Sequence, residues 1–382
     1  MSSTSAPQEL GGADEPALTA YLTYRNCRYF PLLDGLRCLS IVAVVWHHAA
    51  GTAPGTGILS HGNEGVLLFF AISGFLITTL LLRERSQSGS ISLKRFYVRR
   101  ALRIFPLYYA VLGLYAAMVW VVEERSAAGD VFWHNLPYFV TYTSNWFVRL
   151  DSDRVIFYFA WSLATEEQFY LFWPLVMKHG SKRGAAEGVM LGLLLLHGAT
   201  VVALGTAALS SQSFLINVIS GVRPPICLGA LAACLVHSPK GFSWVFRVVG
   251  QSWSAAAALA LTLAALALDL PEWVRCSTMT WLVVSCALQP DQLLRPLLVN
   301  PVVLHISTVS YGMYLLHLLC ISLVRRVTHV QSGPVVFFLG LATSVAAATV
   351  SYRLFESPLL RLKDRIAGRA DKPAPAVAPS PR

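Results

Sequence analysis

Long apolar stretches recur along most of this chain, and they limit what it can fold into more than any other feature. Hydrophobic residues make up 55% of the 382 residues, and charged residues only 13%. Ordinary soluble domains carry about 25% charged residues, whereas a run of about 20 apolar residues can cross a bilayer as a helix. The sequence therefore predicts an all-α polytopic integral membrane protein.

About ten transmembrane helices can be placed. Their approximate ranges are 33–48, 65–82, 101–122, 155–177, 186–206, 216–236, 251–268, 273–289, 303–324 and 334–355. Residues 1–28 lack the apolar core of a cleaved signal, so we expect a disordered cytosolic leader. The Pro- and Ala-rich residues 363–382 are expected to form a disordered cytosolic tail. Residues 29–362 then make up the transmembrane domain.

Basic residues indicate how these spans are oriented. The segment 83–100 contains six Lys or Arg residues and one acid, Glu84, so it is predicted to be cytoplasmic. The loop 51–63 has no Lys or Arg and is predicted to lie outside. Both termini are then cytoplasmic, in a multi-pass protein of the inner or plasma membrane. One loop conflicts with this pattern, because Arg325 and Arg326 would face outward.

Several functions find no support in the sequence. The formal net charge of +10 could indicate nucleic-acid binding, but the basic residues flank apolar spans, where membrane topology accounts for them. The seven cysteines are scattered without the spacing of zinc ligands or of a disulfide framework. Walker, Rossmann and GxSxG patterns do not occur. We therefore expect no nucleic-acid partner and no metal.

The first span carries Arg37 and His48 inside an apolar run. The two residues are eleven positions apart, which on a helix is about three turns and about 20° of rotation, so both project from one stripe about 16 Å apart. His47 points about 100° away. Ionisable groups at this depth cost at least a few kcal/mol unless paired or hydrated, so the stripe is a candidate site. The alternative is that Arg37 extends to the interface and His48 caps the far end.

Two further spans contain polar residues. Glu166 and Glu167 lie within 155–177, either as a hydrogen-bond hub or as carboxylates that orient or charge a histidine. Span 303–324 places Ser310, Tyr314 and His317 on one polar stripe. For His317, a packing role is favoured over a catalytic one.

Arginines at the ends of spans have two interpretations. Arg100 and Arg103 are three positions apart and so share one side of a helix. They are either interface anchors or a clamp for the phosphates of an anionic donor such as coenzyme A. Arg223 lies beside Pro224 and Pro225, which free backbone groups, and it is equally compatible with an anchor and a site.

These stretches, taken in order, resemble the motifs of the membrane acyltransferase 3 family, bacterial O-acylases of surface polysaccharides, peptidoglycan, Nod factors and macrolides. The resemblance covers about residues 30–362. It is carried by LDGLR with the arginine, ten residues and histidine signature at Arg37 and His48, FFAISGFLIT around Ser73, RRALRIFPLYY at Arg100 and Arg103, WSLATEEQFYLFWP at Trp161 and Glu166, SYGMYLLH and FESPLLRL. The chain departs from the family at Phe159, where relatives often have histidine.

The resemblance implies transfer of an acyl group, most often acetyl, from cytosolic acyl-CoA to a hydroxyl of a sugar-containing acceptor. His48 would be the general base, supported by Arg37 and Glu166, and Arg100 with Arg103 would bind the CoA moiety. Further binding or supporting residues would be Ser73, Trp161, Arg223, Tyr314 and His317. A proton-coupled secondary transporter or flippase is the alternative, because buried His, Glu and Arg side chains could also line a proton pathway.

Overall fold

The computed structural model describes residues 15–27, 29–50, 57–124, 126–149, 154–180, 184–206 and 214–366, and within these ranges all regular structure is helical. The prediction of an all-α protein is confirmed. The helices in chain order are α1 (Glu15–Asn26), α2 (Pro31–Ala50), η1 (Gly57–Glu64), α3 (Gly65–Ser88), α4 (Leu93–Val122), α5 (Ala127–Val140), α6 (Ser144–Phe147), α7 (Ala160–His179), α8 (Ala185–Gly205), α9 (Phe214–Ser220), α10 (Pro224–His237), α11 (Pro239–Val249), α12 (Ser254–Ala267), α13 (Glu272–Leu288), α14 (Arg295–Leu298), α15 (Pro301–Thr328), α16 (Pro334–Ser351), the π-helix η2 (Tyr352–Glu356) and α17 (Ser357–Ile366).

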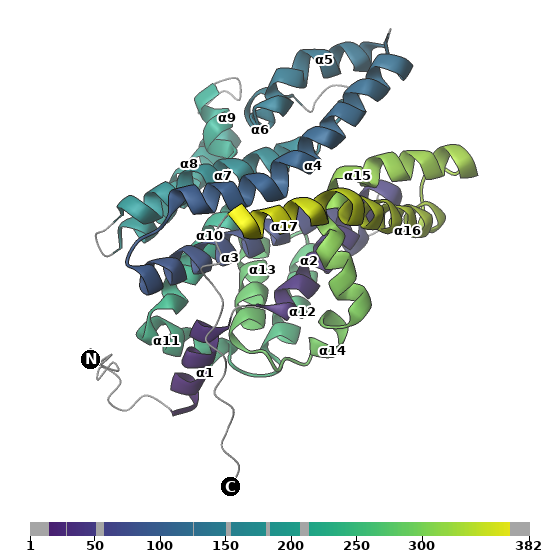
Figure 1. Ribbon diagram of the computed structural model, residues 1–382. Helices are drawn as coiled ribbons and strands as arrows, with labels where there is room; N and C mark the ends of the chain where they lie inside the picture. Colours follow the sequence, from purple (N-terminus) through teal and green to yellow (C-terminus); the bar gives the residue numbers. More distant parts are fainter. Residues whose placement is uncertain are drawn as a thin grey trace.

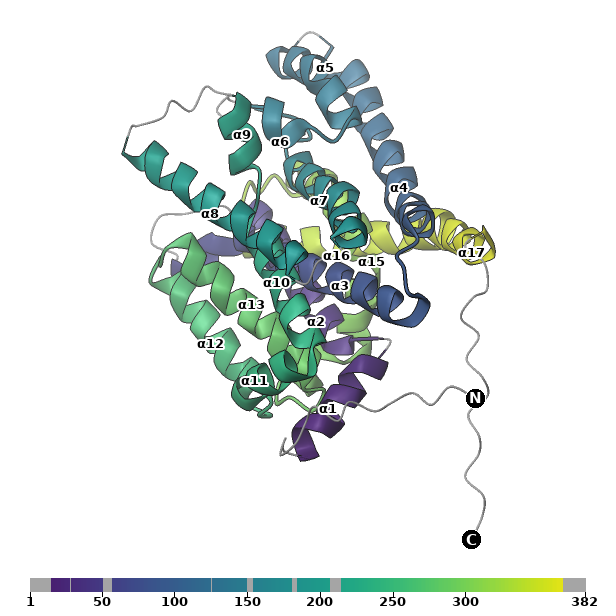
Figure 2. The same ribbon diagram turned by 90° about the vertical axis from the view of Figure 1, so that its left-hand side faces the viewer.

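The main body is a bundle built on α2, α3, α10, α13, α15 and α16. Helix α3 packs along α10, α15 packs along both α16 and α2, and α12 pairs with α13 (Figure 1). Helices α4 and α5 extend away from this bundle, and α17 lies beside α4 (Figure 2). A second, aromatic-rich core joins α4 and α5 to the segment before α7 and to the middle of α15. This arrangement leaves α2, α3, α4, α7 and α15 around a common centre.

Among the described residues, six helices are long and apolar enough to cross a membrane, or eight if each of two bent helix pairs counts as one span. The expected number of about ten is not confirmed. The predicted spans 216–236 and 251–268 fall in the bent pairs, α9 with α10 at 49° and α11 with α12 at 72°. The predicted spans 155–177 and 273–289 correspond to α7, which carries two adjacent glutamates, and to α13, which has only 17 residues.

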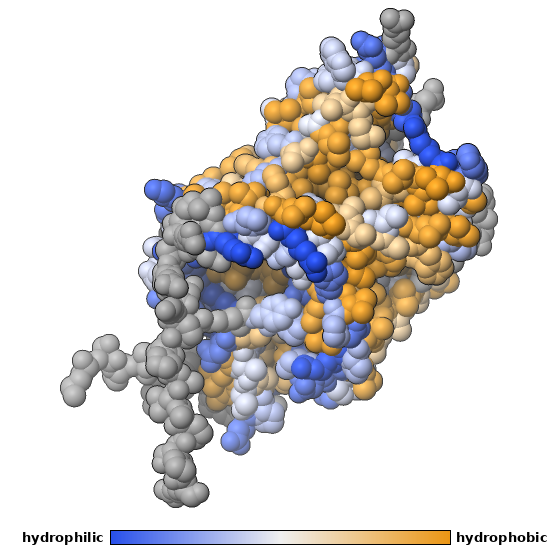
Figure 3. All heavy atoms as spheres, turned by 45° about the vertical axis from the view of Figure 1, so that its right-hand side comes forward, coloured by the Kyte–Doolittle hydropathy of each residue, from blue (hydrophilic) through white to orange (hydrophobic). Residues whose placement is uncertain are grey.

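Apolar side chains cover much of the surface between the hydrophilic ends. Figure 3 shows a broad apolar region, with hydrophilic residues gathered mainly below it. Several large apolar residues are exposed along the outward faces of α4 and α8, among them Trp120 and Leu195. A multi-pass membrane protein accounts for this surface, because lipid solvates such side chains.

Part of the predicted disordered leader is helical. In α1, Tyr21 and Tyr24 pack against Phe242 of α11 with ring centroids 5.3 and 5.6 Å away, and the Tyr21 hydroxyl donates to the His237 carbonyl. The two tyrosines are three positions apart, so they share a helix face, which the composition of residues 1–28 as a whole conceals. The remainder of the leader, 1–14 and 28, and the tail after 366 lie outside the described residues.

Backbone contact between α3 and α10 depends on two glycines. A Cβ atom on Gly74 would lie 2.0 Å from the Ile226 carbonyl oxygen, and one on Gly229 would lie 2.3 Å from the Ala71 carbonyl oxygen. Small residues permit such close approach of helices in lipid. The sequence of the second span, in which small residues interrupt the apolar run, contained this signal.

We expect Gly74→Ala to destabilise the protein by about 1–3 kcal/mol, because the helices must separate to admit the methyl group. The measurement is thermal unfolding in detergent. Gly113→Ala is the matched control, since a Cβ atom there meets nothing within 4 Å and alanine is the better helix former. Equal melting temperatures for the two variants would contradict the prediction.

Candidate active site

Three cavities follow one another between the central helices. We name them the arginine cavity, of about 380 Å³, the middle cavity, of about 90 Å³, and the histidine cavity, of about 360 Å³. The arginine and middle cavities share Arg37, Arg100, Arg103, Ser310 and Tyr311 in their walls. The middle and histidine cavities share Val66 and Tyr314. Because neighbouring cavities share lining residues, the three cavities form one continuous series.

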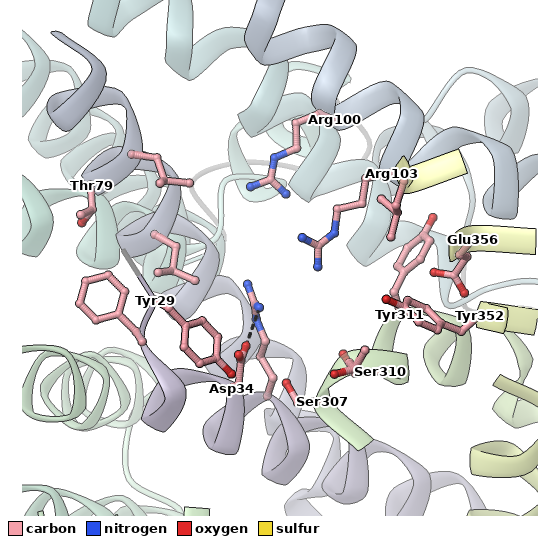
Figure 4. A pocket seen from close by; sticks show the side chains of 16 residues that line it. Tyr29, Asp34, Thr79, Arg100, Arg103, Ser307, Ser310, Tyr311, Tyr352 and Glu356 are labelled. Atoms are coloured by element: carbon pink, nitrogen blue, oxygen red, sulfur yellow. Dashed lines mark hydrogen bonds and ion pairs between the residues drawn. The ribbon is translucent and has the colours of Figure 1, made fainter. Parts of the chain in front are cut away.

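Three guanidinium groups dominate the arginine cavity. Arg100 and Arg103 point from α4 towards Asp34 on α2, as Figure 4 shows. Arg37 forms an ion pair with Asp34 at 2.9 Å, and both side chains are about one-fifth exposed. Tyr352 and Glu356, from the π-helix η2, also line this cavity. The three cations therefore outnumber the two carboxylates, and the cavity suits an anionic ligand.

The middle cavity brings together Glu166 and Ser73, two of the residues selected from the sequence. The Glu166 carboxylate accepts hydrogen bonds from the hydroxyls of Ser73 on α3 and Tyr170 on α7. The guanidinium of Arg100 lies 4.5 Å from the Tyr170 ring centroid. Glu166 thus belongs to a network that reaches the arginines, and it does not contact an imidazole. Among the described residues, its hydrogen-bond partners come from α3 and α7 and not from the end of α2, so the structure gives no contact for the predicted pairing of Glu166 with His48.

His48 lies in the histidine cavity with partners that the sequence did not reveal. Its Nδ1 atom lies 2.9 Å from the Tyr158 hydroxyl, and its carbonyl oxygen accepts a 2.7 Å hydrogen bond from Arg325. The His317 ring centroid lies 5.0 Å from that of His48. Arg325 lies in the last turn of α15, in a stretch that was predicted to be a loop and that conflicted with the charge pattern, so that conflict was the available signal. Tyr158 precedes α7, and no feature of the sequence indicated that it would contact His48.

Arg37 and His48 lie in different cavities although they share a helix. Because α2 is continuous from Pro31 to Ala50, eleven positions separate them by about 16 Å. One lines the arginine and middle cavities and the other the histidine cavity. The polar stripe on α2 therefore runs along the series of cavities. His47 was expected to point elsewhere, but it also lines the histidine cavity, and its ring lies 4.9 Å from that of His48.

On the stripe of α15, His317 is buried and Tyr314 is half-buried. The Tyr314 hydroxyl contacts Ser162 at 2.5 Å and the Phe159 carbonyl at 3.2 Å. His317 Nδ1 lies 2.7 Å from the Tyr314 carbonyl. Phe159 is buried, with its ring 5.8 Å from that of His317. Phe159, at the position where the family resemblance led us to expect histidine, thus gives the histidine cavity an apolar side chain.

Trp161 and Arg223 meet at the wall of the histidine cavity. The Arg223 guanidinium lies 4.8 Å from the Trp161 ring centroid, within the range of a cation–π interaction. Arg275 also lines the cavity and pairs with Glu64 at 3.3 Å. This wall can both donate and accept hydrogen bonds. No group of three His, Cys, Asp or Glu side chains suited to a metal ion occurs in the described part of the chain.

Helices of membrane-spanning length enclose a basic cavity, which joins through a small cavity to one with a hydrogen-bonded imidazole. This arrangement suits a membrane-embedded group-transfer enzyme. The sequence model of the acyltransferase 3 family, described as an acyltransferase domain, matches residues 30–353. The chain therefore belongs to the membrane acyltransferase 3 family and carries its acyltransferase domain over these residues.

Relatives in Staphylococcus aureus carry names of the same kind. The chain is 27% identical over 368 residues to SACOL0978 of strain COL, provisionally named an O-acetyltransferase, with 88% of this chain and 58% of the relative covered. It is 27% identical over 371 residues to O-acetyltransferase OatA of strain NCTC 8325, with 87% and 57% covered. The chain thus spans less than three-fifths of either relative. No solved structure matches it.

Proposed function

We propose that the protein transfers an acyl group, acetyl in the first place, from acyl-CoA to a hydroxyl of a sugar-containing acceptor. The observation that carries this proposal is the single polar stripe of α2, which has Arg37 in the arginine cavity and His48 in the histidine cavity. Donor and acceptor would occupy opposite ends of the series. A proton-coupled transporter is less well supported, because the family and the named relatives are acyltransferases.

The arginine cavity is the proposed site of the CoA moiety. Arginine forks pair with phosphate through charge-assisted, often bidentate hydrogen bonds. Arg100 and Arg103 of α4 line this cavity. Arg100 is the last residue of the basic segment 83–100, which is expected to be cytoplasmic, and Arg103 follows it by three positions. Acyl-CoA would therefore bind from the cytosol.

The histidine cavity is the proposed site of the acceptor. His48 takes the proton of the acceptor hydroxyl, and the oxygen attacks the thioester carbonyl carbon. The C–O bond forms, the C–S bond breaks, and the imidazolium returns the proton to the CoA thiolate. The Tyr158 hydroxyl oxygen lies 2.9 Å from Nδ1 and 3.5 Å from Nε2 of the ring. When Nδ1 carries the proton and donates it to this oxygen, the lone pair on Nε2 is the one that acts as base. Positioned bases of this kind contribute about 10²–10⁴-fold to rate.

The direct test is transfer of labelled acetyl by the purified protein. Incubation with [¹⁴C]acetyl-CoA and neutral oligosaccharides should yield labelled ester that mild alkali releases. Transport assays in liposomes provide the comparison. Uptake of acceptor without any ester formation would overturn the proposal in favour of the transporter.

The predicted orientation of the chain in the membrane can be tested separately. In a Cys27→Ser background, Ser88→Cys should react with an impermeant maleimide only after cell lysis, whereas Glu124→Cys, at the other end of α4, should react in intact cells. Both positions are exposed, and the other six cysteines are buried. Labelling of Ser88→Cys from outside would reverse the topology and the side assigned to the donor.

A further inference from the structure

The arginines and the catalytic histidine are separated by one boundary. Arg100 and Arg103 line the arginine and middle cavities but not the histidine cavity, whereas His48 lines only the histidine cavity. Val66 and Tyr314 line both the middle and the histidine cavities. Among these three cavities, the space lined by the arginines therefore meets the space lined by His48 beside these two side chains. We call this place the neck.

We propose that Val66 and Tyr314 form a size filter that restricts the transferred acyl group to short chains. This inference rests on the proposed function and adds to it the class of acyl donor. The thioester carbon must lie at the neck during transfer, because the donor phosphates and the base are on its two sides. The acyl chain attached to that carbon must then fit between Val66 and Tyr314.

The space before the neck is small and partly apolar. The middle cavity measures about 90 Å³, against about 380 and 360 Å³ for its neighbours. The middle cavity is thus about a quarter of the size of either neighbour. Its apolar lining comes from Phe69, Phe70, Ile104 and Leu163. Such a space suits a short hydrocarbon chain better than a long one.

Val66 is held in place by close backbone packing. It is the second residue of α3 and is 9% exposed. A Cβ atom on Gly62 would lie 2.4 Å from the Ala43 carbonyl oxygen, and one on Gly65 would lie 2.4 Å from the Ser40 carbonyl oxygen. The start of α3 therefore rests directly on the α2 backbone. Val66 cannot move away from the neck unless this packing opens.

Tyr314 is fixed on the other side by its hydroxyl group. The contacts with Ser162 at 2.5 Å and with the Phe159 carbonyl at 3.2 Å tie the ring to the start of α7. Both walls of the neck are thus anchored to neighbouring helices. A packed protein interior yields little to one extra methylene, so a rigid neck can discriminate between chain lengths.

The experiment compares acetyl-CoA, butyryl-CoA and octanoyl-CoA as donors for the purified protein and its variants. We expect the wild type to prefer acetyl-CoA, and Val66→Ala to raise the ratio of kcat/KM for butyryl-CoA over acetyl-CoA by about 10-fold or more, since one methylene discriminates by about 10–200-fold. Val66→Ile, which narrows the neck, should lower the same ratio. It also provides an independent readout should the alanine variant fold poorly.

Val45→Ala is the matched control, because Val45 is fully buried and lines none of the three cavities. It should leave the donor ratio unchanged. An unchanged ratio in both Val66 variants, with acetyl transfer intact, would overturn the size filter but not the proposed function. Absence of transfer from every acyl-CoA by the wild type would overturn the proposed function and the filter with it.

Discussion

His48→Ala is expected to lower acetyl transfer by about 10²–10⁴-fold, which is the usual loss on removal of a positioned base. The reason is geometric, because the ring lies at the wall of the histidine cavity with its Nδ1 atom 2.9 Å from the Tyr158 hydroxyl. The measurement is kcat for labelled acetyl transfer by the purified variant. Thermal unfolding of the same sample shows whether the fold survives.

His197→Ala is the control for the loss of a buried imidazole. His197 is buried on α8 and lines none of the three cavities, so its removal should leave turnover close to that of the wild type. His47→Ala should lie between the two variants, because His47 shares the cavity but not the Tyr158 contact. Near-normal turnover in His48→Ala, or equal losses in His48→Ala and His197→Ala, would contradict the assignment of His48 as the general base.

Local periodicity predicted those features that depend on a single helix. The 3.6-residue repeat was enough to align Arg37 with His48, because α2 is continuous over both. The same repeat put Arg100 beside Arg103, and both line the arginine cavity. The apolar content was enough to predict an all-α membrane fold.

Contacts between distant helices could not be predicted in this way. Glu166 bonds to Ser73, 93 positions earlier in the chain, and no periodicity within α7 selects that partner over His48. Arg325 reaches the carbonyl of His48 across 277 positions. The count of about ten spans is not confirmed for a related reason, since hydropathy along the chain does not reveal that α11 and α12 are bent by 72°.

Arg100→Ala and Arg103→Ala are each expected to raise the apparent KM for acetyl-CoA by about 10–150-fold, because a hydrogen bond to a charged group is worth about 1.5–3 kcal/mol. Both side chains point into the arginine cavity, where the CoA phosphates are proposed to bind (Figure 4). The KM for the acceptor should change little, since its proposed site lies beyond the neck. The measurement is steady-state kinetics with each substrate varied in turn.

Arg99→Ala separates a phosphate clamp from an interface anchor. Arg99 lies next to Arg100 on α4 but is about 100° around the helix, and it lines neither the arginine nor the middle cavity. If the arginines merely anchor α4 at the interface, all three variants should lose stability alike and keep the donor KM of the wild type. If they hold phosphate, only Arg100→Ala and Arg103→Ala should weaken the donor, and their difference from the wild type should shrink with added salt, because ions screen the attraction that the removed charge contributed.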